Sequence, residues 1–175
     1  MADEVKPKQR IVLIGMDGSE HAKHSFQWYL KHLLREGDNP ILFHCVELCS
    51  SRHMTKWMYA PYAFDRDTLS NLLEQESQSL RHKLEEYAHM MRDAKVHGTV
   101  KSIHAERPGE GIVKAAEESH ADLVIVGSRG HGKVRRTLLG SVSDYVLHHC
   151  HVPVIVCPHK HEHHHGHHDK DEEHK

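Results

Sequence analysis

The strongest constraint on this chain is the stretch 121–142, where an apolar run leads directly into a cluster of glycines. Leu123–Val126 is apolar and rich in β-branched residues, but it is too short for a helix. That pattern predicts a buried strand. Gly127, Gly130 and Gly132 follow within six residues. Glycine allows positive φ and close approach of another group, so these positions predict a tight turn after the strand.

Positive charge surrounds these glycines, from Arg129, Lys133, Arg135 and Arg136. A second pair of small residues, Gly140-Ser141, begins another helical pattern. A strand that leads into glycines, cations and a helix start can direct backbone N–H groups at a phosphate. Two simpler interpretations stay open. The glycines can serve tight packing in a structural βα turn, and Arg135 and Arg136 can belong to a solvated face.

Two better-known phosphate motifs do not fit. Gly127 to Lys133 matches G-x-x-x-x-G-K, but Val134 stands where a P-loop needs the hydroxyl that binds magnesium. Gly130-His131-Gly132 begins a dinucleotide fingerprint, but Arg135 occupies the third glycine position.

Apolar runs alternate with helical patterns along the chain. Strands are predicted at Ile11–Ile14, Ile41–Val46, Val100–Ala105, Leu123–Val126 and Pro153–Cys157. Helices are predicted after the cap Ser19, from about Thr68 to His97, from Pro108, and after a capping box formed by Ser141 and Asp144. This order predicts an α/β fold with a parallel, doubly wound sheet.

The loop has the spacing of a known family. Gly127-x-x-Gly130, nine further residues and then Gly140-Ser141 resemble the nucleotide loop of the universal stress proteins, in their UspA-like, ATP-binding branch. Arg10–Ser19 and Leu138–Leu147 resemble that family too. The resemblance implies a five-stranded sheet of order 3-2-1-4-5, Rossmann-like and of the adenine nucleotide alpha hydrolase type. It also implies bound ATP or AMP, with magnesium possible alongside ATP, in a stress sensor or regulator.

The resemblance carries a set of binding residues onto this sequence. Asp17 would hold the ribose or the adenine edge, although it can equally initiate the turn at Gly18. Cys45 stands where a valine is usual against adenine, which puts adenine selectivity in question. The set comprises Gly15, Met16, Asp17, Cys45, Val126, Gly127, Ser128, Arg129, Gly130, His131, Gly140, Ser141, Val142 and Ser143.

No catalytic constellation is evident, because no residue near the loop is an obvious general base. We therefore expect weak hydrolysis or none. A slow ATPase or nucleotide hydrolase is the alternative, and metal-dependent turnover would reveal it.

Composition narrows the class further. The 175 residues have a net charge of -2, so no global positive field predicts nucleic-acid binding. Scattered cysteines, no apolar leader and no membrane-length apolar run predict a cytoplasmic protein without a membrane partner. We expect a flexible arm at 1–9, one domain at 10–158 and a disordered tail at 159–175.

The tail holds eight histidines among acids and lysines. Neutral imidazoles bind zinc, nickel or copper, so a metal-handling protein is a further alternative; a solubilising tail is the simpler one. The candidate ligands are His161, His163, His164, His165, His167 and His168.

The last strand predicts a homodimer. The implied strand order places the apolar segment Val152–Cys157 at a sheet edge, and an exposed apolar edge favours pairing with a second copy.

Overall fold

A computed structural model describes residues 9–47, 66–129 and 139–158. It contains one five-stranded parallel sheet of order β3-β2-β1-β4-β5, which confirms the predicted fold class and strand order. The strands are β1 (Arg10–Gly15), β2 (Asp38–Glu47), β3 (Thr99–Ala105), β4 (Leu123–Gly127) and β5 (Val154–Cys157). The helices are α1 (Glu20–His32), α3 (Arg66–Asp93), α4 (Pro108–Glu118) and α5 (Ser141–His149).

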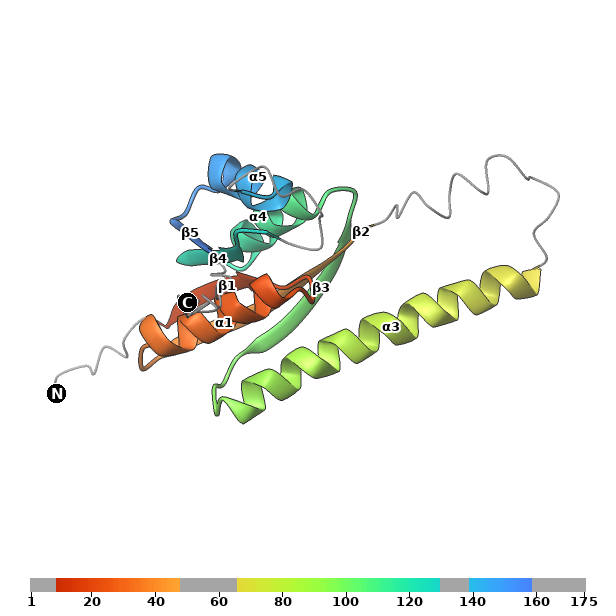
Figure 1. Cartoon of the computed structure of the whole chain (residues 1–175), viewed down its shortest axis with the longest axis horizontal. Coiled ribbons are helices and arrows are strands. Elements are labelled where there is room, and N and C mark those ends of the chain that lie inside the picture. The colour runs from red at the N-terminus through yellow and green to blue at the C-terminus, as the bar shows by residue number, and fades with distance from the viewer. Residues whose placement is uncertain (1–8, 48–65, 130–138, 159–175) are drawn as a thin grey trace, which may run out of the picture.

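Helices cover both faces of the sheet, α1 and α3 on one and α4 and α5 on the other (Figure 1). Alternation along β1 produces this division, because successive strand side chains point to opposite faces. Val12 and Ile14 pack in the α1–α3 core, whereas Leu13 packs in the α4–α5 core. All three are almost fully buried. An apolar run without polar alternation is what a strand covered on both faces requires.

The helix starts follow the predictions in two cases and depart from them in one. The Ser19 side chain caps α1 by accepting the N–H of Ala22, and Pro108 opens α4. In α5, however, Gly140 is the N-cap, so the predicted capping box of Ser141 and Asp144 is wrong. Extended backbone at Gly140 places Ser141 one position inside the helix, where its side chain cannot serve as the cap.

Helix α3 is longer than the sheet is wide. Near its C-terminal end Tyr87 and Met91 are buried in the core, but its first turns extend past the sheet (Figure 1). Leu73, in this projecting part, is 59% exposed. The helix ends at Asp93 rather than near His97, because the chain turns through a positive φ at Lys95.

A part-buried ion pair joins β1 to β2 at the amino edge of the sheet. Arg10 donates to both carboxylate oxygens of Asp38, from Nε at 2.8 Å and from Nη2 at 2.6 Å. The Asp38 side chain is 1% exposed and also accepts the Tyr29 hydroxyl and the Arg35 N–H. Burial alone would raise the pKa of Asp38, but the hydrogen bonds from Arg10, Arg35 and Tyr29 lower it below its ordinary value.

We expect Asp38→Asn to lower the free energy of unfolding by about 3 kcal/mol, because it leaves the part-buried guanidinium without its charge partner. A lowered pKa means that the carboxylate stabilises the fold above the ordinary aspartate pKa of about 3.9, and that this stabilisation is lost as the pH falls through the folded-state value. Urea unfolding across acidic pH measures both effects. Equal acid sensitivity in Asp38→Asn and the wild type would contradict this assignment.

Candidate functional site at the carboxyl edge of the sheet

The strand order reverses between β1 and β4, and both strands end at the same edge. Ile14 pairs with Ile125, which brings the end of β1 beside the end of β4 although more than a hundred residues separate them. Helices α1, α4 and α5 all begin at this edge, since each follows a parallel strand or its loop. Ligands of doubly wound sheets bind at such a switch point.

The end of β1 is held by backbone and side-chain hydrogen bonds. The Met16 N–H donates to the Phe43 carbonyl at 2.7 Å. One carboxylate oxygen of Asp17 accepts the Ser19 N–H at 2.8 Å, and Gly18 between them has φ 85°. Asp17 therefore forms the turn that the sequence allowed as its simpler role. A carboxylate has several acceptor positions, so this bond does not exhaust its capacity for a ligand hydroxyl.

The end of β4 is joined to the start of α5 through one carbonyl group. The Ser128 carbonyl accepts the Gly140 N–H at 2.7 Å and lies 3.1 Å from the Ser143 hydroxyl. That hydroxyl also lies 3.0 Å from the Gly140 carbonyl, and Ser143 is buried. These contacts hold the helix start against the strand end. Ser143 therefore positions the start of α5, and its predicted place in the nucleotide site stays a prediction.

Gly127 lies close against α1. A Cβ at this position would lie 3.0 Å from the backbone carbonyl carbon of His21 in α1. Gly140 differs, because a Cβ there would lie 3.4 Å from the Ser128 oxygen and 3.5 Å from the Arg129 Cα, which are ordinary contacts. The two glycines thus have different roles. Gly127 allows α1 to pack close to the end of β4, whereas Gly140 leaves space at the start of α5.

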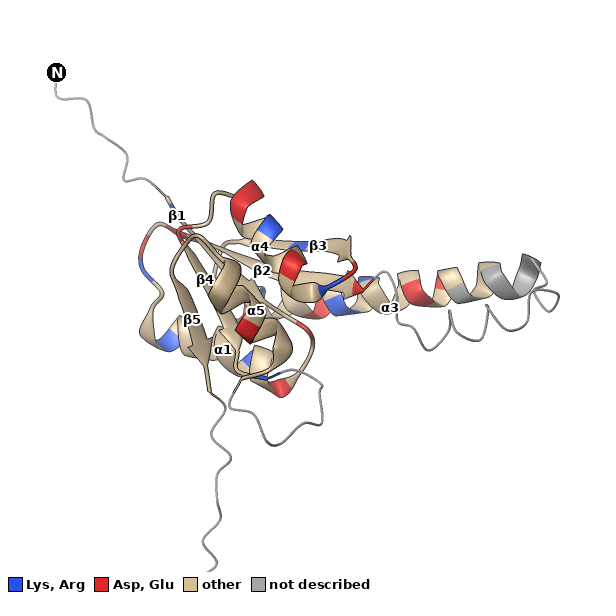
Figure 2. Ribbon diagram, turned by 90° about the horizontal axis from the view of Figure 1, so that it is seen from above, with Lys and Arg blue, Asp and Glu red and all other residues tan. Residues whose placement is uncertain are grey.

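The start of α5 is the electropositive feature of this edge. The first N–H groups of a helix have no carbonyl partner within it, and none of the described side chains caps α5. Ser141 is exposed, and the half-buried Arg129 is close in space, because a Cβ at Gly140 would lie 3.5 Å from its Cα. Elsewhere the two signs of charge are interspersed over the helices and loops (Figure 2). The start of α5 is therefore one local feature of this edge that suits an anion.

Several predicted site residues are core residues in the structure. Met16 and Val126 are 3% exposed and pack in the two cores. Cys45 packs toward α4, where a Cβ at Gly111 would come within 2.7 Å of its sulfur. Burial raises the pKa of the Cys45 thiol. Gly15 lies where a Cβ would contact Val126, so it too serves strand packing.

Other predicted residues lie outside the described ranges. They are Gly130 and His131, the cations from Lys133 to Arg136, and the tail histidines from His161 to His168. Within residues 9–47, 66–129 and 139–158, no group of three or more His, Cys, Asp or Glu side chains is arranged to hold a metal ion.

The structure adds two residues that the sequence did not single out for the site. The His44 ring is buried on β2 and hydrogen-bonds the Met16 carbonyl at 2.7 Å. Its ring centroid lies 6.0 Å from that of Tyr87 on α3. Burial and the negative charges of Asp17 and Glu86 raise the pKa of Tyr87. In the sequence, the apolar spacing of this helix predicts that Tyr87 is buried but does not identify its neighbours.

The sheet order, the crossover between β1 and β4 and the helix start at Gly140 define a doubly wound α/β protein. The sequence model of the universal stress protein family matches residues 9–158. The chain therefore belongs to the universal stress protein family.

Individual proteins agree with this membership. Universal stress protein Sll1388 of Synechocystis sp. is 28% identical over 151 residues, which are 85% of this chain and 97% of that protein. The structure of MJ0577 from Methanocaldococcus jannaschii superimposes with a TM-score of 0.66 at 25% identity, covering 87% and 97% of the two chains. A universal stress family protein of Arabidopsis thaliana, solved with AMP bound, gives 0.62 at 17% identity over 86% and 92%. That last likeness concerns the fold.

Among the described helices, none is both long and apolar enough to cross a bilayer.

Replacing Gly127 or Gly140 with alanine should change the free energy of unfolding by different amounts. Gly127→Ala should lower the free energy of unfolding by about 2 kcal/mol or more, because the α1 backbone must move. Gly140→Ala should change it by less than about 1 kcal/mol, because its φ of -78° and its surroundings accept a Cβ. Denaturant unfolding of both variants measures the difference. Equal destabilisation would show that Gly127 has no special packing role.

Proposed function

We propose that this protein binds an adenine nucleotide, ATP or AMP, at the carboxyl edge between β1 and β4 and acts as a stress sensor or regulator. The observation that carries the proposal is the start of α5, held against the end of β4 by the Ser128 carbonyl. The helix is thereby rigid before any ligand arrives. A rigid set of backbone donors binds an anion without first being ordered.

In this proposal the phosphates bind at the start of α5. The N–H groups of Ser141 and Val142 are first-turn donors, and Gly140 leaves their approach unobstructed by a side chain. Arg129 adds positive charge at the end of β4. Gly130 and His131 would complete the phosphate loop by the family resemblance. Magnesium would accompany ATP rather than AMP, because it bridges adjacent phosphates.

The nucleoside belongs across the switch point, toward Asp17. This carboxylate is an acceptor for a ribose hydroxyl or an adenine amino group. AMP in the Arabidopsis relative supports an adenine nucleotide as the ligand class. Cys45 packs toward Gly111 in this protein, so adenine recognition rests on the backbone and Asp17 more than on that thiol.

Binding is proposed without efficient hydrolysis. Chemistry on the terminal phosphate needs a group that activates water, and the described part of the edge offers Asp17, which already accepts the Ser19 N–H. Phosphate release well below about 1 s⁻¹ is the expected result, since ordinary enzymes exceed that rate.

The Asp17→Asn variant tests the role of Asp17 in ligand binding while keeping its role in the turn. Asparagine keeps an oxygen that can accept the Ser19 N–H but loses the charge, so the fold should persist while affinity for ATP and AMP falls by about tenfold. The matched control is Asp122→Asn. Asp122 accepts the Ile11 N–H at 2.8 Å at the opposite edge of the sheet, so this variant makes the same chemical change away from the site.

Titration calorimetry with each nucleotide compares the two variants. Equal affinity in Asp17→Asn and Asp122→Asn would remove Asp17 from the site. No heat of binding for either nucleotide in the wild type would refute the proposed function.

We also propose that β5 pairs with its copy in a homodimer. β5 is the edge strand of the sheet, and Val154, Ile155 and Val156 are only half-buried there. An antiparallel two-fold match would satisfy the edge N–H and C=O groups. Ile155→Lys should convert the dimer to a monomer in sedimentation velocity at micromolar concentration. A wild type that is already monomeric would contradict the pairing.

A further inference from the structure

The core between α1, α3 and the sheet contains a tyrosine hydroxyl without a partner. Tyr87 is 0% exposed, and within residues 9–47, 66–129 and 139–158 no group forms a hydrogen bond with its hydroxyl. A buried hydroxyl without an acceptor lowers stability, whereas a phenylalanine would fill the same space without that cost. Packing alone therefore does not account for the hydroxyl.

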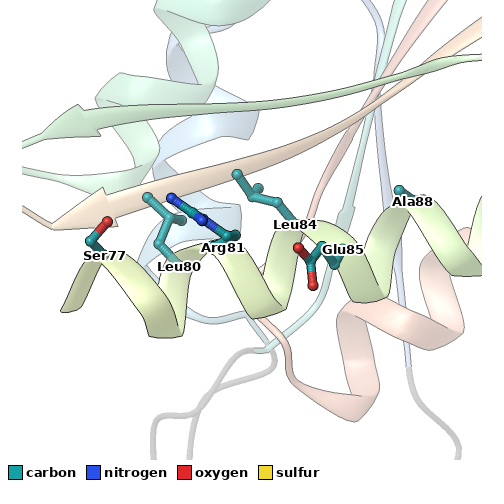
Figure 3. Close-up of a pocket in the computed structure, with 6 residues that line it drawn as sticks. All are labelled: Ser77, Leu80, Arg81, Leu84, Glu85 and Ala88. Carbon is teal, nitrogen blue, oxygen red and sulfur yellow. The ribbon is translucent and has the colours of Figure 1, made fainter. Parts of the chain in front are cut away.

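Tyr87 lies on the face of α3 that packs against the sheet. Leu84, three residues earlier, packs against the same core. Figure 3 shows the turns of α3 that precede Tyr87, where Leu80 and Leu84 point from the helix toward the strands. The ring centroid of Tyr87 is 6.0 Å from that of His44. Tyr87 therefore lies against the carboxyl half of β2.

His44 joins this part of the core to the end of β1. Its Nδ1 lies 2.7 Å from the Met16 carbonyl, and because a carbonyl only accepts, Nδ1 donates. Met16 is followed directly by Asp17, whose carboxylate accepts the Ser19 N–H. Burial, and after it the negative charge of Asp17, raises the pKa of Tyr87. Tyr87 and Asp17 are thus close enough for the carboxylate charge to act on the hydroxyl.

Tyr87 lies deeper in the protein than Asp17. Asp17 is half-buried, whereas the hydroxyl of Tyr87 is inaccessible. A ligand at the carboxyl edge can therefore contact Asp17 but not Tyr87, so any effect of Tyr87 on that ligand is indirect. A carboxylate has about four acceptor positions, so one carboxylate can accept the Ser19 N–H, a ligand hydroxyl and a further donor.

We propose that Tyr87 is a positioning residue of the nucleotide site, whose hydroxyl donates to the Asp17 carboxylate when a ribose hydroxyl binds there. The inference rests on the proposed function, because it requires the ribose at Asp17. Donation from the buried side holds the carboxylate in the orientation that faces the ligand. Hydrogen bonds of a functional site often reach their full geometry only in the complex, and bonds to a charged acceptor are among the stronger ones.

Tyr87→Phe removes the hydroxyl and keeps the ring. Affinity for AMP and ATP should fall about fivefold in titration calorimetry, because Asp17 loses a donor that holds it. The urea midpoint of unfolding should stay the same or rise, since the hydroxyl has no partner among the described residues. This variant therefore separates ligand binding from stability.

Tyr29 provides the matched control. It is 0% exposed in the same core, and its hydroxyl donates to Asp38 at 2.9 Å at the amino edge of the sheet. Tyr29→Phe should lower the urea midpoint, because Asp38 loses a donor, and should leave nucleotide affinity unchanged. The two variants make the same chemical change and should give opposite results in the two measurements.

A double-mutant cycle tests whether Tyr87 acts through Asp17. In the Asp17→Asn background, where the charge is absent, Tyr87→Phe should lower affinity by less than about twofold. The Raman doublet of tyrosine, which responds to hydrogen bonding of the hydroxyl, adds a readout that packing does not move. The difference spectrum of wild type and Tyr87→Phe isolates Tyr87, and adding AMP should shift it toward that of a strong donor.

Failure of this inference is distinguishable from failure of the proposed function. A wild type that binds neither nucleotide overturns both. Weaker binding in Asp17→Asn but not in Tyr87→Phe overturns only the role of Tyr87. Equal losses from Tyr87→Phe in the wild-type and Asp17→Asn backgrounds also overturn it, and so does an equal loss of affinity in Tyr29→Phe, which would assign the effect to the core.

Discussion

The pairing of β1 on both of its sides is the constraint on which the rest of this protein depends. β1 joins β2 at one side and β4 at the other, so it connects the two halves of a sheet whose chain order reverses around it. Both of its ends are also tied down. Asp122 accepts the Ile11 N–H at the amino edge, and the Met16 N–H meets the Phe43 carbonyl at the carboxyl edge. Hydrogen bonds therefore fix both ends of the strand that leads to the proposed site.

Glycine serves two purposes at that edge, and the structure separates them. Gly127 allows α1 to approach the end of β4, while Gly140 starts a helix whose first N–H groups have no side-chain cap among the described residues. The Ser128 carbonyl connects the two features by accepting the Gly140 N–H. The proposed site would recognise an anion mainly through backbone groups. Recognition by backbone depends on the placement of elements more than on the identity of nearby side chains.

Helix α3 has two parts with different surroundings. Its C-terminal part completes the core through Tyr87 and Met91, and its N-terminal part extends beyond the sheet (Figure 1). Through Tyr87 the C-terminal part reaches the side of the sheet on which His44 donates to the Met16 carbonyl.

The sequence by itself determined the fold and the family. Apolar runs of strand length, helical periodicity and the glycine spacing are local patterns, and each follows from backbone geometry within a few residues. They correctly predicted the five strands and the cap at Ser19. Tertiary structure alone decided the contacts between distant segments. The approach of His21 to Gly127, the Ser143 hydroxyl at the Ser128 carbonyl and the Arg10–Asp38 pair join residues that no local pattern relates. The predicted capping box at Ser141 is wrong for the same reason. The Gly140 N–H donates to the Ser128 carbonyl at the end of β4, which the local pattern does not include.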